Sequence, residues 1–508
     1  MQKVFSIAQI READKYTIDN EPITSVNLME RAARACYTWM MCNVDKIEVA
    51  TVAVVCGMGN NGGYGLALAR MLAISGIEVK VYIIVLSDKG TPDFEINRQR
   101  LSQLDCIDLR YISSGSDFEL PSTTTIVVDA LLGSGLSRPT EGLLESIIKK
   151  INVFNAYKIA IDMPSGLFAD RSSVGNTVFE ANHTLTFQCP KLPFFFPENE
   201  RFVGEFHVLD IGLHSRYIDE TPTSMYYVAD VEMPSKMIRR PKFSHKGTFG
   251  HALLVAGGVG KVGAAIFAAK ACMYMGCGLT MVHLPANAVA CMQVAFPEAM
   301  VSIDRDDNMF TSLPDDMDKY TAAGVGPGLG TDEKSVAALK DFLSLWNKPL
   351  VLDADALNMI AMNKEEMLPM LKPNTIITPH VKEFRRWVGD WADDFDRLEK
   401  QLQLAMHYGI VVVLKGANTS VCCPDGKVYF NSTGNPGMAT GGSGDVLTGV
   451  ITSLLAQGFA AKEAAVSGVY LHGLAGDKAA ETIGQVSMTA SDICLAIRQV
   501  MKDIAQHK

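Results

Sequence analysis

Short β-rich runs alternate with helical stretches along this chain, and this alternation limits the possible fold more than any other feature. Candidate strands lie at residues 51–56, 79–86, 126–132, 158–163 and 206–211. After a polar stretch with Pro222, Pro234 and Pro241, the pattern restarts at residues 252–256, 350–352, 375–378 and 410–415. Such alternation predicts parallel sheets with helices on both faces, and ligands at the carboxyl ends of the strands. Because 508 residues exceed what one core usually supports, we expect two tandem α/β domains, residues 1–225 and 226–508.

Composition excludes several classes of partner. The net charge is −10 and no basic stripe is visible, which argues against nucleic acid. The eleven cysteines lack paired or metal-ligand spacing, as expected of free thiols in a reducing compartment. The charged N-terminus is not a signal peptide, and the uncharged run 271–297 contains too many polar, Gly and Pro residues for a membrane span. We therefore expect a cytoplasmic protein without a membrane partner, and a homo-oligomer, although the sequence is silent on that state.

A glycine-rich segment at residues 435–445 (NPGMATGGSGD) opens a candidate helix. Its glycines leave backbone N–H groups bare at a helix N-terminus, which favours an anion. Asp445 then places a carboxylate beside that anion, and Leu447, Val450 and Ile451 follow at the spacing of a helix that packs by one face. An anion cradle with an adjacent acid suits phosphoryl transfer to an alcohol. The alternative is a plain turn with Asp445 as a helix-start acid, and the motif alone leaves both interpretations open.

Three polar loops follow strands of the first domain. Residues 57–62 fit G-x-G-x-x-G, a weak dinucleotide signal, and we expect a loop over 57–65 with a helix at 66–74. Asp129 and Asp162 each close a strand, and Ser165 follows the second. Loops at one edge of a parallel sheet converge, so oxygens of Asn61, Asp129 and Ser165 could hold a hard cation. Each residue by itself could equally cap a helix or close a turn.

These segments resemble the NAD(P)H-hydrate epimerase family over roughly residues 1–215. The resemblance lies in residues 54–63 (VVCGMGNNGG), 129–136 (DALLGSGL) and 162–166 (DMPSG). It implies a Rossmann-like three-layer α/β/α fold, potassium bound by Asn61, Asp129 and Ser165, and Asp162 as the residue that transfers a proton. Tyr64 stands where the family usually has Asp, which removes one acceptor from the ligand loop. The implied contacts of the hydrated nicotinamide cofactor are Asn60, Asn61, Gly62, Gly63, Tyr64, Gly133, Ser134, Gly135, Leu136, Ser137, Arg138, Pro139 and Asp162.

The second half resembles the ADP/ATP-dependent NAD(P)H-hydrate dehydratase family, which has a ribokinase-like α/β fold. The resemblance runs from about residue 235 to the C-terminus and includes the segments 324–330, 353–358, 378–380, 415–419 and 441–445. It implies Mg²⁺ and ADP as phosphoryl donor, with ATP also possible. The implied nucleotide contacts are Lys415, Gly416, Ala417, Asn418, Thr419 and Gly444, and the implied contacts of the hydrated cofactor are Ala264, Gly328, His380 and Asp445.

Both families occur fused in one bacterial polypeptide in this order, which implies repair of the hydrates of NADH and NADPH (NADHX and NADPHX). One domain would interconvert the R and S epimers, and the other would dehydrate the S form. Asp445 would take the proton from the ring hydroxyl, which attacks the terminal phosphoryl group; loss of phosphate then restores the double bond. The alternative is a ribokinase-like kinase for a sugar or vitamin precursor with a non-catalytic ligand-binding N-terminal domain. A kinase accumulates a phosphorylated product, whereas a dehydratase releases phosphate and restores NADH.

Overall fold

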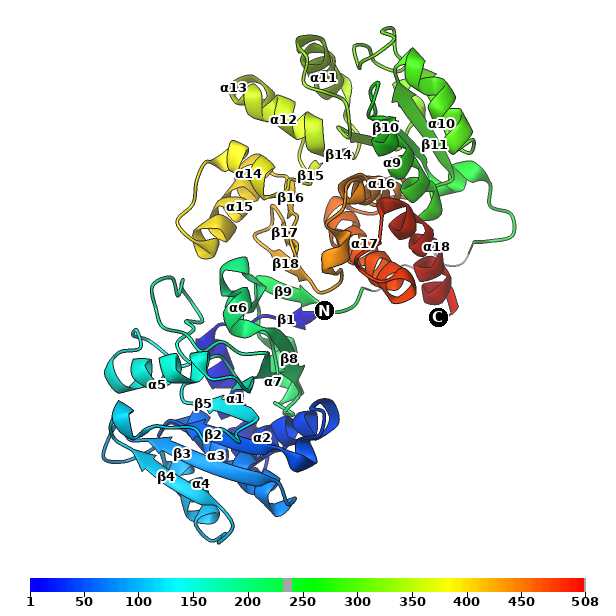
Figure 1. The fold of residues 1–508 in the computed structure, drawn as a ribbon. Coiled ribbons are helices and arrows are strands. Elements are labelled where there is room, and N and C mark those ends of the chain that lie inside the picture. The colour runs from blue at the N-terminus through cyan, green and yellow to red at the C-terminus, as the bar shows by residue number, and fades with distance from the viewer. Residues whose placement is uncertain (232–239, 507–508) are drawn as a thin grey trace. The chain divides into compact units, whose positions relative to one another are not determined.

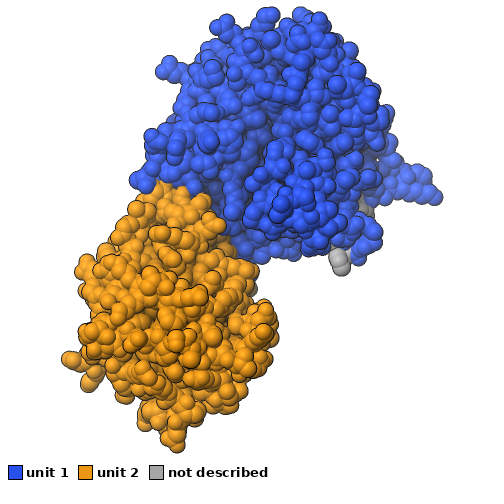
Figure 2. All heavy atoms as spheres, in the orientation of Figure 1, with its two compact units in different colours: residues 1–2, 224–392, 396–508 blue, residues 3–223, 393–395 orange. Residues whose placement is uncertain are grey.

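The computed structural model describes residues 1–231 and 240–506, and these form two compact units (Figure 2). The N-terminal unit comprises residues 3–223 with 393–395, and the C-terminal unit comprises residues 1–2, 224–392 and 396–508. Of the three prolines expected at the junction, Pro234 lies outside the described residues. None of the helices in the described ranges is both long and apolar enough to cross a membrane.

The N-terminal unit is built on a seven-stranded, wholly parallel sheet (Figure 1). Its order is β4 (Asp108–Ile112), β3 (Glu78–Ile84), β2 (Thr51–Cys56), β5 (Ile126–Ala130), β6 (Tyr157–Ile161), β7 (His183–Phe187) and β8 (Glu205–Leu209). Its helices are α1 (Ile7–Asn20), α2 (Ser25–Asn43), α3 (Asn60–Ile74), α4 (Pro92–Leu101), α5 (Gly142–Val153), α6 (Glu200–Val203) and α7 (Ser215–Glu220).

Alternate residues of β2 pack into two different hydrophobic clusters, one on each face of the sheet. Val52 and Val54 pack with residues of α2 and α3, such as Leu28 and Leu66. Val55, on the opposite face, belongs to a cluster with residues of α5. Because successive side chains of a strand point to opposite faces, the sheet is covered on both sides, as the predicted three-layer α/β/α fold requires.

The predicted loop over residues 57–65 is wrong, because α3 already begins at Asn60. Its glycines serve close packing rather than a flexible loop. A Cβ atom at Gly62 would lie 1.8 Å from the carbonyl oxygen of Gly57, and one at Gly65 would lie 2.5 Å from the Cβ of Ala130. The helix can therefore start directly after β2 and press its first turn against the sheet.

The C-terminal unit is built on an eleven-stranded sheet in which β17 runs antiparallel to both of its neighbours. The order is β1 (Gln2–Lys3), β9 (Met225–Val228), β18 (Val428–Asn431), β17 (Ser420–Cys422), β16 (Val411–Leu414), β15 (Ile376–Ile377), β14 (Leu350–Leu352), β13 (Ala322–Val325), β10 (His251–Val255), β11 (Leu279–Leu284) and β12 (Met300–Ile303). Its helices are α9 (Val262–Tyr274), α10 (Val289–Ala295), α11 (Glu333–Leu345), α12 (Ala354–Met362), α13 (Lys364–Met367), α14 (Val381–Val388), α15 (Asp394–Tyr408), α16 (Ser443–Ala456), α17 (Ala461–Ile483) and α18 (Ala490–Gln506).

Helix α16 occupies the centre of this unit. Every residue from Val446 to Ala456 is buried, so the expectation that it packs by one face only is wrong. The helix shares a core cluster with α9, α17, α18 and the sheet. Its polar residues tolerate this burial because they bond within the helix; the Thr452 hydroxyl, for example, donates to the Thr448 carbonyl at 2.7 Å. A central helix of this kind holds its N-terminus rigidly.

Candidate active sites

The N-terminal unit contains a cavity of about 700 Å³ at the carboxyl ends of its parallel strands. Ten of the predicted cofactor contacts line it: Asn60, Asn61, Tyr64, Gly133, Ser134, Gly135, Leu136, Ser137, Arg138 and Asp162. Gly62, Gly63 and Pro139 are not among its lining residues in the part of the chain that the structure describes. The two glycines instead pack α3 against its neighbours.

Asp162 is held by Lys191, which reaches the same cavity from beyond β7. The Lys191 ammonium lies 2.9 Å from the Asp162 carboxylate and also donates to the Thr186 hydroxyl at 2.6 Å and the Phe187 carbonyl at 3.1 Å. The Ser134 amide donates to the other Asp162 oxygen at 3.1 Å. Burial acts to raise the pKa of Asp162, but Lys191 and the Ser134 hydrogen bond outweigh it and hold that pKa below its ordinary value. Asp162 is thus an ionised carboxylate.

Asp14 of α1 lines the same cavity, and sequence reasoning missed it. Burial, and then the negative charge of Asp162, raise the pKa of Asp14 to about 6, against the opposing effect of Lys191. The cavity therefore holds two carboxylates whose pKa values are displaced in opposite directions. Such a pair is typical of an acid and a base in one site.

The predicted cation ligands meet around the backbone of Leu132. The Asn61 amide donates to the Leu132 carbonyl at 2.8 Å. The Ser165 hydroxyl accepts from the Leu132 amide at 2.8 Å and donates to Asp129 at 2.6 Å. Burial raises the pKa of Asp129 to about 6, although hydrogen bonds from Ser165 and Leu131 oppose the rise. Asn61 Oδ1 is buried, and no described residue donates a hydrogen bond to it. An orphaned amide oxygen beside a carboxylate, a hydroxyl and a carbonyl fits a hard cation.

Tyr64 gives this cavity an aromatic wall. Its ring lies 4.9 Å from that of Phe187, centroid to centroid. Burial, followed by the charges of Asp14 and Asp162, raises the pKa of the Tyr64 hydroxyl well above its ordinary range. The residue stays protonated and adds no negative charge where the family usually carries a carboxylate.

In the C-terminal unit, residues that follow two strands meet at the N-terminus of α16. Lys415, after β16, forms an ion pair of 2.8 Å with Asp353, after β14. The Thr448 hydroxyl of α16 donates to the second Asp353 oxygen at 2.7 Å. A Cβ atom at Gly444 would lie 3.5 Å from the Lys415 ammonium, so the bare first turn of α16 faces this cation. Exposed amides beside a lysine make an anion site.

Asp445 lies beside the same ion pair. Within the described ranges, its carboxylate makes no hydrogen bond or ion pair that would occupy it. Burial, and then the charge of Asp353, raise the pKa of Asp445 to about 6; Lys415 opposes this and Asp355 adds to it. Because Lys415 is paired with Asp353, Asp445 is left as a proton acceptor suited to neutral pH.

Two further predicted contacts, Gly328 and Ala264, are brought together. His380 caps a helix, and its contact with the hydrated cofactor stays a prediction. A Cβ atom at Gly328 would lie 3.3 Å from the Cβ of Ala264 at the start of α9. His380 caps α14: its Nδ1 accepts from the Lys382 amide at 3.0 Å, and its own amide donates to Glu383 at 2.8 Å. His380 also bridges to Lys415 in the sheet, so it positions the lysine.

The residues expected to bind the nucleotide at positions 415–419 form a closed turn after β16. The Gly416 amide donates to the Thr419 hydroxyl at 3.2 Å, and that hydroxyl donates to the Gly416 carbonyl at 2.9 Å. Ala417 and Asn418 lie at the tip of this turn. Their role as nucleotide contacts stays a prediction.

Comparison with known proteins assigns each half of the chain. Residues 25–192 match the family described as YjeF-related protein N-terminus, and residues 252–499 match NAD(P)H-hydrate dehydratase. The Bifunctional NAD(P)H-hydrate repair enzyme Nnr of Thermofilum pendens is 33% identical over 96% of this chain and 94% of its own length. The enzyme of the same name from Escherichia coli is 32% identical over 97% and 92%.

A crystal structure of ADP/ATP-dependent NAD(P)H-hydrate dehydratase from Bacillus subtilis, obtained with ATP and Mg²⁺, is 30% identical over 52% of this chain and 94% of its own, with a TM-score of 0.45. The full-length similarities confirm the predicted family, the pairing of an epimerase half with a dehydratase half, and the α/β fold class of both. The chain belongs to the family of bifunctional NAD(P)H-hydrate repair enzymes.

Proposed function

We propose that this chain repairs hydrated NADH and NADPH in two steps, with residues 1–225 as the epimerase domain and residues 226–508 as the dehydratase domain. The observation that carries the proposal is the Asp445 carboxylate, free of partners in the described residues and set beside the Lys415–Asp353 pair and the bare turn at Gly444. Family membership supplies the substrate class.

In the dehydratase half, Asp445 removes the proton from the ring hydroxyl of the S hydrate. The hydroxyl oxygen then forms a bond to the terminal phosphorus of ADP, and the bond from that phosphorus to the AMP oxygen breaks. Lys415 and the amides of residues 442–444 stabilise the charge that develops on the phosphoryl oxygens. Phosphate then leaves with its carbon–oxygen bond electrons, the neighbouring ring carbon loses a proton, and the double bond of NADH is restored.

Magnesium fits the same place. Lys415 lies 2.8 Å from Asp353, and Lys261 lies 3.3 Å from Asp355. The carboxylate of Asp445, which has no such partner among the described residues, is therefore the one left to face a cation. Hard carboxylate oxygens are the ligands that Mg²⁺ prefers, and the ion usually arrives with nucleotide phosphates. When bound, it would neutralise phosphate charge. We propose ADP as the donor, with ATP as a possible substitute.

In the epimerase half, Asp14 and Asp162 divide acid and base roles. The hydroxyl-bearing carbon of the substrate lies next to the ring nitrogen, so loss of the hydroxyl leaves a cation that the nitrogen stabilises. Asp14 gives its proton to the hydroxyl, the carbon–oxygen bond breaks, and water leaves. Water then adds to either face of the ring and gives its proton to Asp162, after which proton exchange with solvent restores both carboxyl groups.

A potassium ion is the proposed occupant of the Asn61, Asp129 and Ser165 site, supported by the orphaned Asn61 oxygen. It would tie the first turn of α3 to the loops after β5 and β6 and supply positive charge near the cofactor phosphates. A homo-oligomer and a cytoplasmic location stay predictions, which light scattering and cell fractionation test directly.

The deciding experiment incubates purified protein with mixed hydrate epimers and ADP or ATP, and follows recovery of the NADH absorbance band. Asp445→Asn should lower turnover about a hundredfold or more while ADP binding persists, because only the positioned base is lost. Asp425→Asn, in an exposed turn paired with Lys462, is the matched control and should behave as wild type. Accumulation of a phosphorylated product without NADH would establish the kinase alternative instead.

A further inference from the structure

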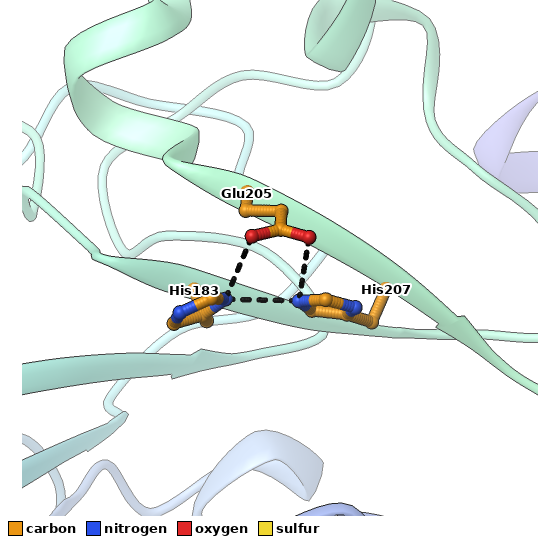
Figure 3. Close-up of side chains that lie close together, drawn as sticks. All are labelled: His183, Glu205 and His207. Atoms are coloured by element: carbon orange, nitrogen blue, oxygen red, sulfur yellow. Dashed lines mark hydrogen bonds and ion pairs between the residues drawn. The ribbon is translucent and has the colours of Figure 1, made fainter. Parts of the chain in front are cut away.

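His183, Glu205 and His207 form a cluster outside both proposed active sites (Figure 3). The parallel strands β7 and β8 pair His183 directly opposite Glu205, and His207 follows two residues later on the same face of β8. His183 Nδ1 lies 2.9 Å from His207 Nε2. Each of these nitrogens lies 3.8 Å from a different oxygen of Glu205. One potential ligand atom from each of the three residues therefore lies within 4.8 Å of the other two.

This cluster has no part in the proposed reactions. His183 and Glu205 are the first residues of their strands, whereas the cavity with Asp162 lies at the carboxyl ends of the same sheet. The two imidazoles are also held in place. The Trp39 ring of α2 lies 5.2 Å from His183 and 4.7 Å from His207, centroid to centroid. Fixed side chains lose little entropy on binding a ligand.

The donor set matches a transition metal. Two imidazoles and a carboxylate are a common ligand set for zinc, which binds such atoms at about 2.0–2.2 Å. Tetrahedral geometry at that bond length places ligand atoms roughly 3.4 Å apart. The nitrogen–nitrogen separation of 2.9 Å is shorter than this value, and each nitrogen lies 3.8 Å from a different oxygen of Glu205. To seat the ion, the two rings must move apart by about half an ångström and the carboxylate must turn one oxygen toward both of them. Glu205 is free to adjust, because its side chain is 70% exposed.

We propose that His183, Glu205 and His207 bind a transition-metal dication, with Zn²⁺ as the best match and water in the fourth position. The bound ion would fasten the edge strand β8 to β7 and so stabilise the N-terminal unit.

The test measures Zn²⁺ binding to the full chain after chelator treatment and alkylation of exposed thiols, by titration calorimetry and metal analysis. We expect one equivalent per chain and a melting temperature that rises with Zn²⁺. His207→Ala and His183→Ala should lose this equivalent. His407→Ala, which removes an exposed histidine at the end of α15, is the control and should retain it.

Glu205→Gln guards against misfolding, because this exposed side chain can change without disturbing the core. Loss of a residue that merely supports a metal ligand typically costs 10–100-fold in affinity, so loss of the ligand itself should weaken Zn²⁺ binding at least about 100-fold. Bound Co²⁺ should show the visible absorption of a tetrahedral nitrogen–oxygen site without thiolate charge-transfer bands. Absence of binding in the wild type, or unchanged affinity in Glu205→Gln and His207→Ala, would overturn the proposal and leave the 2.9 Å contact as a histidine–histidine hydrogen bond.

Discussion

Replacement of Lys191 by Met should destabilise the N-terminal unit in a way that depends on pH. Lys191 is 1% exposed and is the cation that faces the buried Asp162 carboxylate at 2.9 Å. Without it, Asp162 keeps an unpaired buried charge or takes up a proton. Breaking a buried pair from one side costs about 3–5 kcal/mol, because a charge is left without compensation.

The stability lost through the unpaired charge of Asp162 has an upper limit, which is the free energy of protonating this carboxylate. Protonating a carboxyl group with an ordinary pKa of 3.8 costs about 4.4 kcal/mol at pH 7 and about 1.6 kcal/mol at pH 5, at 1.36 kcal/mol per pH unit. Because Asp162 in the variant can always take up a proton, the pH-dependent part of the stability loss cannot exceed these values. Two further hydrogen bonds, to Thr186 and Phe187, add about 1 kcal/mol each at either pH.

The sign follows from linkage. In the wild type, the lowered pKa of Asp162 stabilises the folded state at pH values above the ordinary pKa of the group. This stability is lost as the pH falls through the lowered pKa. In Lys191→Met the folded-state pKa is raised, so destabilisation grows as pH rises above about 4. The loss of stability in the variant should therefore be up to about 2.7 kcal/mol larger at pH 7 than at pH 5.

Hydrogen exchange of the β5 and β6 amides in the full chain at the two pH values measures this difference. The double variant Lys191→Met with Asp162→Asn removes the charge of Asp162 and should lose the pH dependence that this charge causes, while keeping the smaller constant loss. A remainder should come from Asp14, because Lys191 also lowers the pKa of that residue. An equal loss at both pH values in the single variant would show that Asp162 is not the charge that Lys191 compensates.

Three further predictions concern the proposed reactions. Gly444→Ala should fold normally, because its Cβ would lie 3.5 Å from the nearest atom, Lys415 Nζ, but it should lose nucleotide binding. Gly449→Ala, whose Cβ would meet the Ala268 carbonyl at 2.1 Å, should instead lower the melting temperature. Nucleotide binding retained in Gly444→Ala but lost in a stable Gly449→Ala would disprove the assignment. The rate of dehydration should rise tenfold per pH unit up to about pH 6 and then level off as Asp445 loses its proton. If the chemical step limits the rate and the rate does not change with pH, Asp445 is not the base. Tyr64→Phe keeps the ring contact with Phe187 and should change epimerase kcat/KM by less than about threefold, whereas a large loss would mean that the hydroxyl takes part.

The sequence predicted the strands well because their signal is local. Apolar, β-branched runs bounded by polar or glycine residues were placed within about two residues of the observed β2, β5, β6 and β10. Glycine was the source of the main error. Gly62 and Gly65 suggested a loop by composition, whereas their missing side chains allow α3 to approach β2 and β5. Only the neighbouring backbone distinguishes these two uses of glycine.

The missed site residues have a different cause. Asp14 and Lys191 lie far in the chain from the predicted Asp162, and they share its cavity only after α1 and the loop beyond β7 are packed. A charged residue in an N-terminal helix carries no local sign of burial. Asp353 was visible as a strand-end carboxylate, but its pairing with Lys415 depends on the order of β14, β15 and β16 in the sheet. Such pairings depend on the tertiary structure, which the hydrophobic periodicity of the sequence does not reveal.

Both units contain buried carboxylates and a lysine that pairs with one of them, but the paired carboxylate has a different role in each unit. Each unit places buried acids at the carboxyl ends of parallel strands, with a lysine in an ion pair with one of them. In the N-terminal unit, Lys191 pairs with Asp162 itself, so that acid stays ionised while Asp14 retains its proton to higher pH. In the C-terminal unit, Lys415 pairs with Asp353, so Asp445 is the acid whose pKa rises. The reactive group in each unit is thus determined by which carboxylate the lysine neutralises, and a lysine moved to the other partner should exchange the roles of acid and base.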